Sequence, residues 1–90
     1  MADDPNEAFR RIMDLATRRA AAKAEAIRRF SWIGANAPHD QWDALVEAEI
    51  AQARAIMQAD VVDEFEKQIR SSLDTLKRVR EDAIKGSKKT

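Results

Sequence analysis

The sequence predicts an all-α fold, an antiparallel helical bundle in which three helices form a single domain. Three observations support this expectation. The 90 residues include only two glycines and two prolines, so helix breakers are widely spaced. Apolar side chains recur at intervals of three and four residues, which is the period of an amphipathic helix. Acidic residues repeatedly stand four positions before basic ones, the orientation that stabilises a helix.

The first helix is expected over residues 5–33. Proline is favoured at the first position of a helix and glycine just past its end. Pro5 and Gly34 stand at those two places. A hairpin turn is therefore expected over residues 34–38.

The larger apolar residues indicate which face of this helix is buried. At about 100° per residue, one face collects Phe9, Ile12, Met13, Ala16, Ala20, Ile27 and Phe30. No large apolar side chain occurs between Ala16 and Ala26. A second helix should therefore approach closely at mid-length.

The other two helices are expected over residues 38–58 and 60–85. Residues 39–85 contain no glycine or proline, but their apolar stripe turns by roughly 160° when both halves are plotted on one helix. A straight helix would bury opposite sides at its two ends, so a break is expected near Ala59, with Asp60 as the new N-cap. One continuous helix over residues 38–85, whose far half pairs with another subunit, is the alternative.

Residues 1–90 are expected to form one domain. Gly86 should end the third helix, which leaves residues 1–3 and 86–90 as frayed tails. Alanine accounts for 17 of the 40 hydrophobic residues, so only 23 larger apolar side chains are present. That number is small for a stable monomer of this length, and it predicts close helix contacts, a dimer or an obligate partner.

Composition and charge argue against several classes of function. The blocks of residues 1–35, 36–66 and 67–90 are basic, acidic and basic, with zero net charge, which favours self-association or internal docking over nucleic-acid binding. No apolar run approaches the roughly 20 residues that span a bilayer, and the start of the chain does not resemble a signal peptide. A cytoplasmic location is expected, with export without a leader as the alternative. The single histidine, His39, does not complete a metal site with Asp43, and no cofactor or catalytic residue is expected.

An interaction surface is expected in three parts. Two tryptophans flank the predicted turn, an acidic ridge follows it, and the third helix carries a heptad-spaced seam typical of coiled coils. The residues of this surface are Trp32, Trp42, Asp40, Asp43, Glu47, Val62, Phe65, Ile69, Leu76 and Val79. For the tryptophans, packing at the end of the hairpin is the alternative to a binding hot spot.

Two charged residues stand among apolar ones, Lys23 on the first helix and Glu49 on the second. If the turn is centred near Ala35, the two lie at about the same level of an antiparallel hairpin. We therefore expect a partly buried ion pair that fixes the register of the hairpin.

The tripeptide Trp32-Ile33-Gly34, at the predicted turn of a helical hairpin, resembles the motif of the WXG100 family of small secreted proteins. That resemblance implies a dimeric helical hairpin exported by a dedicated system. The C-terminal tyrosine-containing export signal of that family has no counterpart here, since the chain has no tyrosine.

Stretches 15–19, 30–32 and 65–72 are similar in order and rough spacing to those of the all-helical chorismate mutases. That resemblance implies electrostatic binding of a small dicarboxylate, with Arg18 or Arg19 as the arginine of the first helix. Ser31 stands at the family's lysine position, and its second-helix arginine and late acidic residue are missing. A cationic pocket for such a ligand would need Arg18, Arg19 or Arg28 together with Gln68.

These observations lead to one expected function and its alternatives. The expected function is a non-enzymatic helical protein–protein interaction module, such as a small regulator, adaptor or assembly subunit. Its partner would be a second copy of the chain or another helical protein. The alternatives are a degenerate chorismate-mutase-like protein that binds a small dicarboxylate, and a WXG100-like secreted hairpin.

Overall fold

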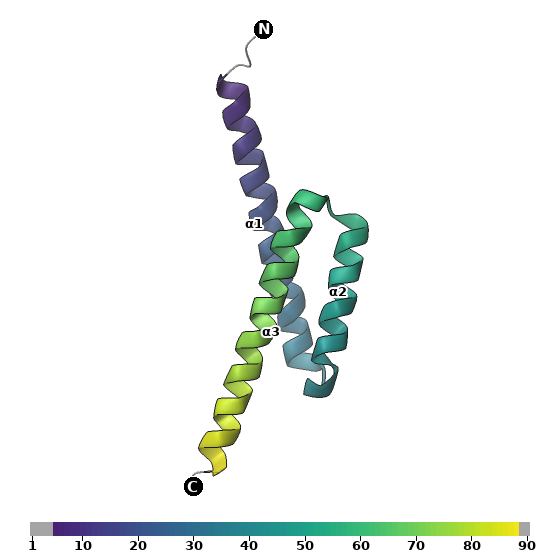
Figure 1. The fold of residues 1–90 in the computed structure, drawn as a ribbon, viewed down its shortest axis with the longest axis vertical. Coiled ribbons are helices and arrows are strands. Elements are labelled where there is room, and N and C mark those ends of the chain that lie inside the picture. The colour runs from purple at the N-terminus through teal and green to yellow at the C-terminus, as the bar shows by residue number, and fades with distance from the viewer. Residues whose placement is uncertain (1–4, 89–90) are drawn as a thin grey trace.

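The structure, a computed structural model, describes residues 5–88. Its elements are α1 (Pro5–Asn36), the short 3-10 helix η1 (His39–Gln41), α2 (Trp42–Ile56) and α3 (Ala59–Lys88). The chain descends along α1, returns along α2 and descends again along α3, so α2 is antiparallel to both neighbours (Figure 1). The all-α bundle expected from the sequence is confirmed, although α1 packs mainly against α3, to which it runs parallel.

The molecule is elongated, with extents of 70 × 26 × 15 Å. The first half of α1 projects beyond the top of α2 and α3, and the last turns of α3 project beyond the other end (Figure 1). Three helices therefore lie side by side only in the middle of the molecule. None of the helices within residues 5–88 combines the length and the apolar character that crossing a bilayer requires.

The hairpin turn begins at Ala37, just before Pro38, rather than at Gly34. The expected end of the first helix at residue 33 is wrong, because α1 continues to Asn36. A residue that precedes proline disfavours the α conformation, so the helix stops before Pro38, and Ala37 N donates the last bond to Ile33 O at 2.9 Å. The second helix, expected over residues 38–58, is instead two elements, because the 3-10 helix η1 precedes α2.

The glycines are not helix terminators. Gly34 lies inside α1 without a positive φ, and a Cβ there would lie 3.2 Å from Leu76 Cδ2 of α3. Its function is therefore the close approach of two helices. Gly86 lies inside α3, so the expected frayed tail is helical as far as Lys88. The tails expected at residues 1–3 and 89–90 lie outside the described residues.

The break between the second and third helices is confirmed. α2 ends at Ile56, Met57 is extended with φ −96° and ψ 153°, and α3 begins at Ala59. Gln58 O accepts from Val61 N and Val62 N at 3.0 Å. The expectation that Asp60 is the N-cap is wrong, since Asp60 lies in the first turn of the helix.

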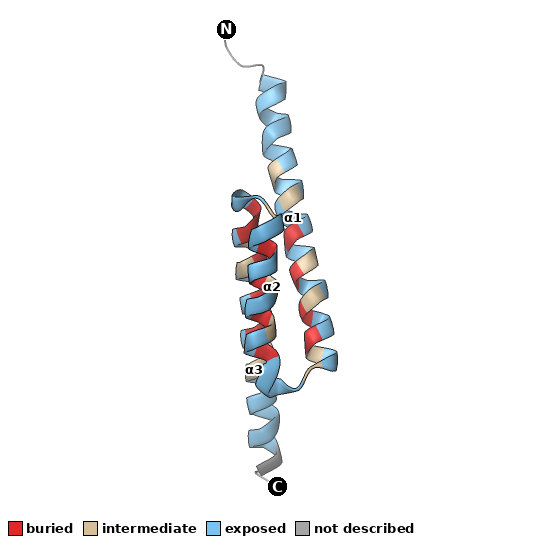
Figure 2. Cartoon of the chain, turned by 90° about the vertical axis from the view of Figure 1, so that its right-hand side faces the viewer, coloured by how far each residue is buried: buried red, intermediate tan, exposed pale blue. Residues whose placement is uncertain are grey.

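Small apolar side chains make up much of the core. The buried positions lie in the middle of the molecule (Figure 2). The buried residues are Ala22, Ala26, Phe30, Ile33, Trp42, Val46, Ile50, Ala53, Val61, Val62, Phe65, Ile69 and Leu73. Buried alanines lie on α1 and α2, which agrees with the close mid-length contact expected from the sequence. The four largest side chains with almost no exposure, Phe65, Ile50, Ile69 and Val46, come from α2 and α3.

The buried face of α1 differs from the predicted one. Of the seven residues expected to be buried there, only Phe30 belongs to the core, while Phe9, Ile12, Met13 and Ile27 are exposed. The buried positions are Ala22, Ala26, Phe30 and Ile33, a row whose centre is rotated by roughly 95° from that of the predicted stripe. Periodicity located an apolar stripe correctly, but another face of α1 meets the other helices.

Candidate interaction surfaces

The two tryptophans near the turn have different environments. Trp42 is 7% exposed, its Nε1 donates to Ala37 O at 3.1 Å, and its ring meets His39 edge to face at 6.2 Å between centroids. It therefore packs the end of the hairpin. Trp32 is 63% exposed. The Trp32-Ile33-Gly34 tripeptide lies in the last turns of α1, and not in the turn where the WXG100 resemblance implied it.

The acidic ridge (Asp40, Asp43 and Glu47) lies next to the basic side of α3. Glu47 Oε1 is 2.7 Å from Arg70 Nη1, and Asp43 Oδ1 is 2.8 Å from Lys77 Nζ. Asp40 is exposed in η1. The charge blocks of the sequence therefore dock on each other within this chain, which leaves less of the ridge available to a partner.

The predicted seam of α3 divides into two parts. Val62, Phe65 and Ile69 are buried in the core. Leu76 is partly buried against that core, and Val79 is 58% exposed and lines a cavity with Phe30 and Leu76. Only the end of the seam is available as an external surface.

The predicted pair of Lys23 with Glu49 is wrong. Glu49 Oε2 lies 2.6 Å from Arg29 Nη1, while Lys23 is exposed and has no ion pair among residues 5–88. The reason is the length of the turn: α1 runs to Asn36 and η1 precedes α2, so the hairpin is centred near His39. Arg29 lies seven residues before the end of α1, and Glu49 lies seven residues after the start of α2.

A network surrounds this pair. Arg29 Nε donates to Glu25 Oε1 at 2.7 Å, and Arg29 Nη1 also donates to Gln52 Oε1 at 3.2 Å. The side chains of Arg29 and Glu49 are 32% and 27% exposed. The network therefore joins α1 to α2 at the edge of the core, where solvent screens it only partly.

A double-mutant cycle on this pair should show coupling. We expect Arg29→Met and Glu49→Gln to have an interaction energy of about 1 kcal/mol, measured by urea denaturation of the two single variants and the double variant. Lys23→Met combined with Glu49→Gln is the matched control and should show almost none. A larger coupling of Glu49 to Lys23 than to Arg29 would contradict the observed register.

Glu25 and Glu66 each accept hydrogen bonds from two guanidinium groups. Bonds from Arg28 and then Arg29 hold the pKa of Glu25 below its ordinary value. Glu25 in turn raises the pKa of Arg29, and Glu49 adds to that rise.

Glu66 joins α2 to α3 in the same way. Arg54 Nη2 of α2 is 2.9 Å from Glu66 Oε1, and Arg70 Nη2 of α3 is 3.2 Å from it. Hydrogen bonds from Arg54 and then from Arg70 lower the pKa of Glu66. The pKa of Arg70 is raised by its hydrogen bonds to Glu47 and Glu66.

The lowered pKa values of Glu25 and Glu66 predict a loss of stability in acid. A glutamate in the unfolded chain has a pKa of about 4.3. Each of these two carboxylates therefore contributes its full share to the free energy of unfolding above that pH, and loses it as the pH falls through the lower pKa of the folded state. Urea denaturation over this range should show a falling free energy of unfolding, with a smaller slope in the Glu25→Gln and Glu66→Gln variants. Glu81→Gln, at an exposed position of α3, should leave the slope unchanged. Equal slopes in all variants would contradict the assignment.

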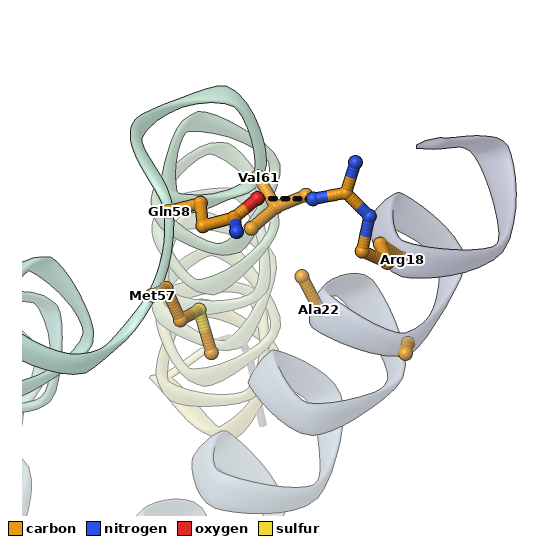
Figure 3. A pocket seen from close by; sticks show the side chains of 6 residues that line it. Arg18, Ala22, Met57, Gln58 and Val61 are labelled. Atoms are coloured by element: carbon orange, nitrogen blue, oxygen red, sulfur yellow. Dashed lines mark hydrogen bonds between the residues drawn. The ribbon is translucent and has the colours of Figure 1, made fainter. Parts of the chain in front are cut away.

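A cavity of about 270 Å³ lies between the middle of α1 and the start of α3 (Figure 3). Arg18 extends from α1 toward Gln58 and donates to its Oε1, and Ala22, Met57 and Val61 line the apolar part. Arg18 also donates to Asp14 Oδ2 at 3.1 Å. Its guanidinium group therefore already has protein partners.

The residues of the dicarboxylate alternative do not converge on this cavity. Gln68 lines a second cavity of about 320 Å³ beside Phe30 and Leu76, and it donates to Ser72 Oγ at 3.1 Å. Arg28 is 75% exposed and bound to Glu25, and Arg19 is exposed. Within one copy of the chain, the arginines are not gathered around Gln68.

An exposed apolar surface of α1 is one that the sequence had assigned to the core. The exposed fraction is 62% for Phe9, 66% for Ile12, 50% for Met13 and 45% for Ile27. We call the row Phe9, Met13, Ala16, Ala20, Lys23 and Ile27 the α1 stripe; all six side chains are exposed, and Ile12 borders them. The periodicity of the sequence contained this surface, but gave no sign that other helices leave it uncovered.

Comparison of the chain with protein-family models, characterised proteins and solved structures gives no match.

Proposed function

We propose that this chain is a non-enzymatic helical protein–protein interaction module that forms a homodimer, in the manner of a small regulator, adaptor or assembly subunit. The observation that carries the proposal is the projecting half of α1. It extends past the other helices as a single helix and exposes Phe9, Ile12 and Met13 by half or more of their surface.

The energetics of this projecting helix favour a partner. Isolated helices shorter than about 12–15 residues are marginal in water, and helices in proteins owe most of their stability to packing of an apolar face. Burying a large aliphatic or aromatic side chain is worth about 1.5–3 kcal/mol. Contiguous exposed apolar side chains of this kind are typical of protein–protein contacts. A partner that covers α1 would therefore gain several kcal/mol and order the helix.

The other end of the molecule supports the same function. Arg80 of α3 reaches His39 of η1, so Ile84, 39% exposed, lies past the end of the bundle, and Val79, 58% exposed, lies just before that end. Val79 continues the coiled-coil-like spacing that is buried earlier in the helix. Trp32 adds a large exposed side chain near the hairpin end. Two projecting segments that are apolar on one side suit an assembly better than an isolated monomer.

Light scattering of the purified protein tests the homodimer. A dimer of the 10.2 kDa chain has twice that mass, and the fraction of dimer should rise with concentration. Mass must be measured directly, because the elongated monomer would elute early from a sizing column. A monomer at every concentration would overturn the homodimer, and catalytic turnover of chorismate would overturn the non-enzymatic assignment.

A further inference from the structure

We propose that the α1 stripe is the contact between two copies of the chain, which pair as antiparallel helices about a two-fold axis near residue 18. The inference rests on the proposed homodimer and specifies its interface. The axis would place Phe9 opposite Ile27 of the second copy, Met13 opposite Lys23, and Ala16 opposite Ala20.

The spacing of the stripe suits a pair of helices. Phe9, Met13, Ala16, Ala20, Lys23 and Ile27 are separated by 4, 3, 4, 3 and 4 residues. This is the a/d pattern of a coiled-coil seam. The row runs about 27 Å along α1 at 1.5 Å per residue, from the projecting half into the three-helix part. All of it is exposed in one copy.

The same row is complementary to itself when reversed. Its two central positions are alanines, so two backbones can approach closely where the helices would cross. Large side chains stand at both ends and meet each other across the pair. A two-fold interface requires this property, because one surface must fit a second copy of itself. A partner of different sequence would not require the stripe to be complementary to itself. We therefore assign a second copy of the chain as the occupant of this surface.

The size and charge of the interface are consistent with a weak, specific dimer. Covering the stripe and Ile12 on both copies would bury on the order of 1,000 Å² in total, near the lower limit for a specific interface. The stem of Lys23 can cover Met13 of the other copy while its ammonium group reaches water. Arg10 and Arg19 border the stripe. The charged residues on the flanks of the stripe are therefore basic. Added salt should not weaken the pairing of two copies, whereas it would weaken the binding of a different partner helix with acidic flanks.

Disulfide cross-linking tests the register, since the chain has no cysteine of its own. A mixture of Met13→Cys and Lys23→Cys chains should form a mixed disulfide dimer. Either variant alone should not, because two residues at position 13 would be about 15 Å apart along the axis, beyond the reach of a disulfide. Asp14→Cys mixed with Lys23→Cys is the matched control, because position 14 lies on the far side of α1.

The outcomes separate this inference from the homodimer itself. A dimer by light scattering without the mixed disulfide, or with ready cross-linking of Met13→Cys alone, would overturn the stripe interface and leave the homodimer standing. A monomer would overturn both. Phe9→Ser should raise the dimer dissociation constant at least 10-fold, measured by light scattering over a range of concentrations. Trp32→Ser, another exposed aromatic position, should leave it unchanged, and a dimer weakened only by Trp32→Ser would refute the assignment.

Discussion

Replacing Phe65 by alanine is expected to destabilise the protein by about 3–5 kcal/mol. Phe65 is 1% exposed and belongs to the buried cluster to which all three helices contribute. Truncation would leave a cavity that the remaining core, rich in alanine, is poorly placed to fill. A domain of this size has roughly 5–15 kcal/mol of stability in total. The substitution would therefore remove a large share of it.

Urea denaturation followed by circular dichroism measures this effect. Trp32→Ala is the matched control, since it also removes a large aromatic side chain, but one that is 63% exposed. We expect a change below about 0.5 kcal/mol for that variant. If the two variants lost similar stability, Phe65 could not occupy the centre of the core as the structure places it.

Local signals in the sequence were sufficient for the number and order of helices. The break before α3 was predicted because the apolar face turns near Ala59, and no straight helix could bury both halves. The predicted turn lies too early in the chain, because the prediction treats Gly34 as a helix terminator. A glycine that ends a helix and a glycine that admits a neighbouring Leu76 look the same in one sequence. Only the tertiary contact distinguishes them.

Which face of α1 is buried could not be predicted from the sequence, for a related reason. Size suggested that Phe9, Met13 and Ile27 face the core, but Ala22 and Ala26 do so instead. Small residues are buried where helices approach closely, and that approach depends on all three helices together. The sequence showed that an apolar stripe exists; it could not show that the middle of the molecule covers a different face.

The ion pair across the hairpin was also predicted only in part. Glu49 was correctly identified as a carboxylate that needs a partner across the hairpin, but its partner is Arg29 and not Lys23. The error equals six residues of α1, and it follows from the misplaced turn centre. Register in a hairpin is set by loop length, so a small error at the turn becomes a different ion pair along the helices.

The close packing of α1 predicts that Ala26 cannot be enlarged. Ala26 is fully buried, with 0% exposure, in the cluster that includes Phe65 and Ile69. Ala26→Leu would add three carbon atoms where no space is open, so α1 must move away from its neighbours or side chains must leave their preferred rotamers. We expect a loss of about 3 kcal/mol, the upper end for overpacking, and a melting temperature lower by about 12–24 °C.

Ala24→Leu separates packing from helix propensity, because position 24 lies two residues away on the same helix and is exposed. Leucine and alanine are both good helix formers, so this control should change stability by less than about 0.5 kcal/mol. Thermal unfolding of both variants is the measurement. If Ala26→Leu were as stable as Ala24→Leu, α1 would not pack closely at this point. The exposure of the α1 stripe would then lose its explanation, since that stripe is left uncovered because the alanine face is the one that meets the other helices.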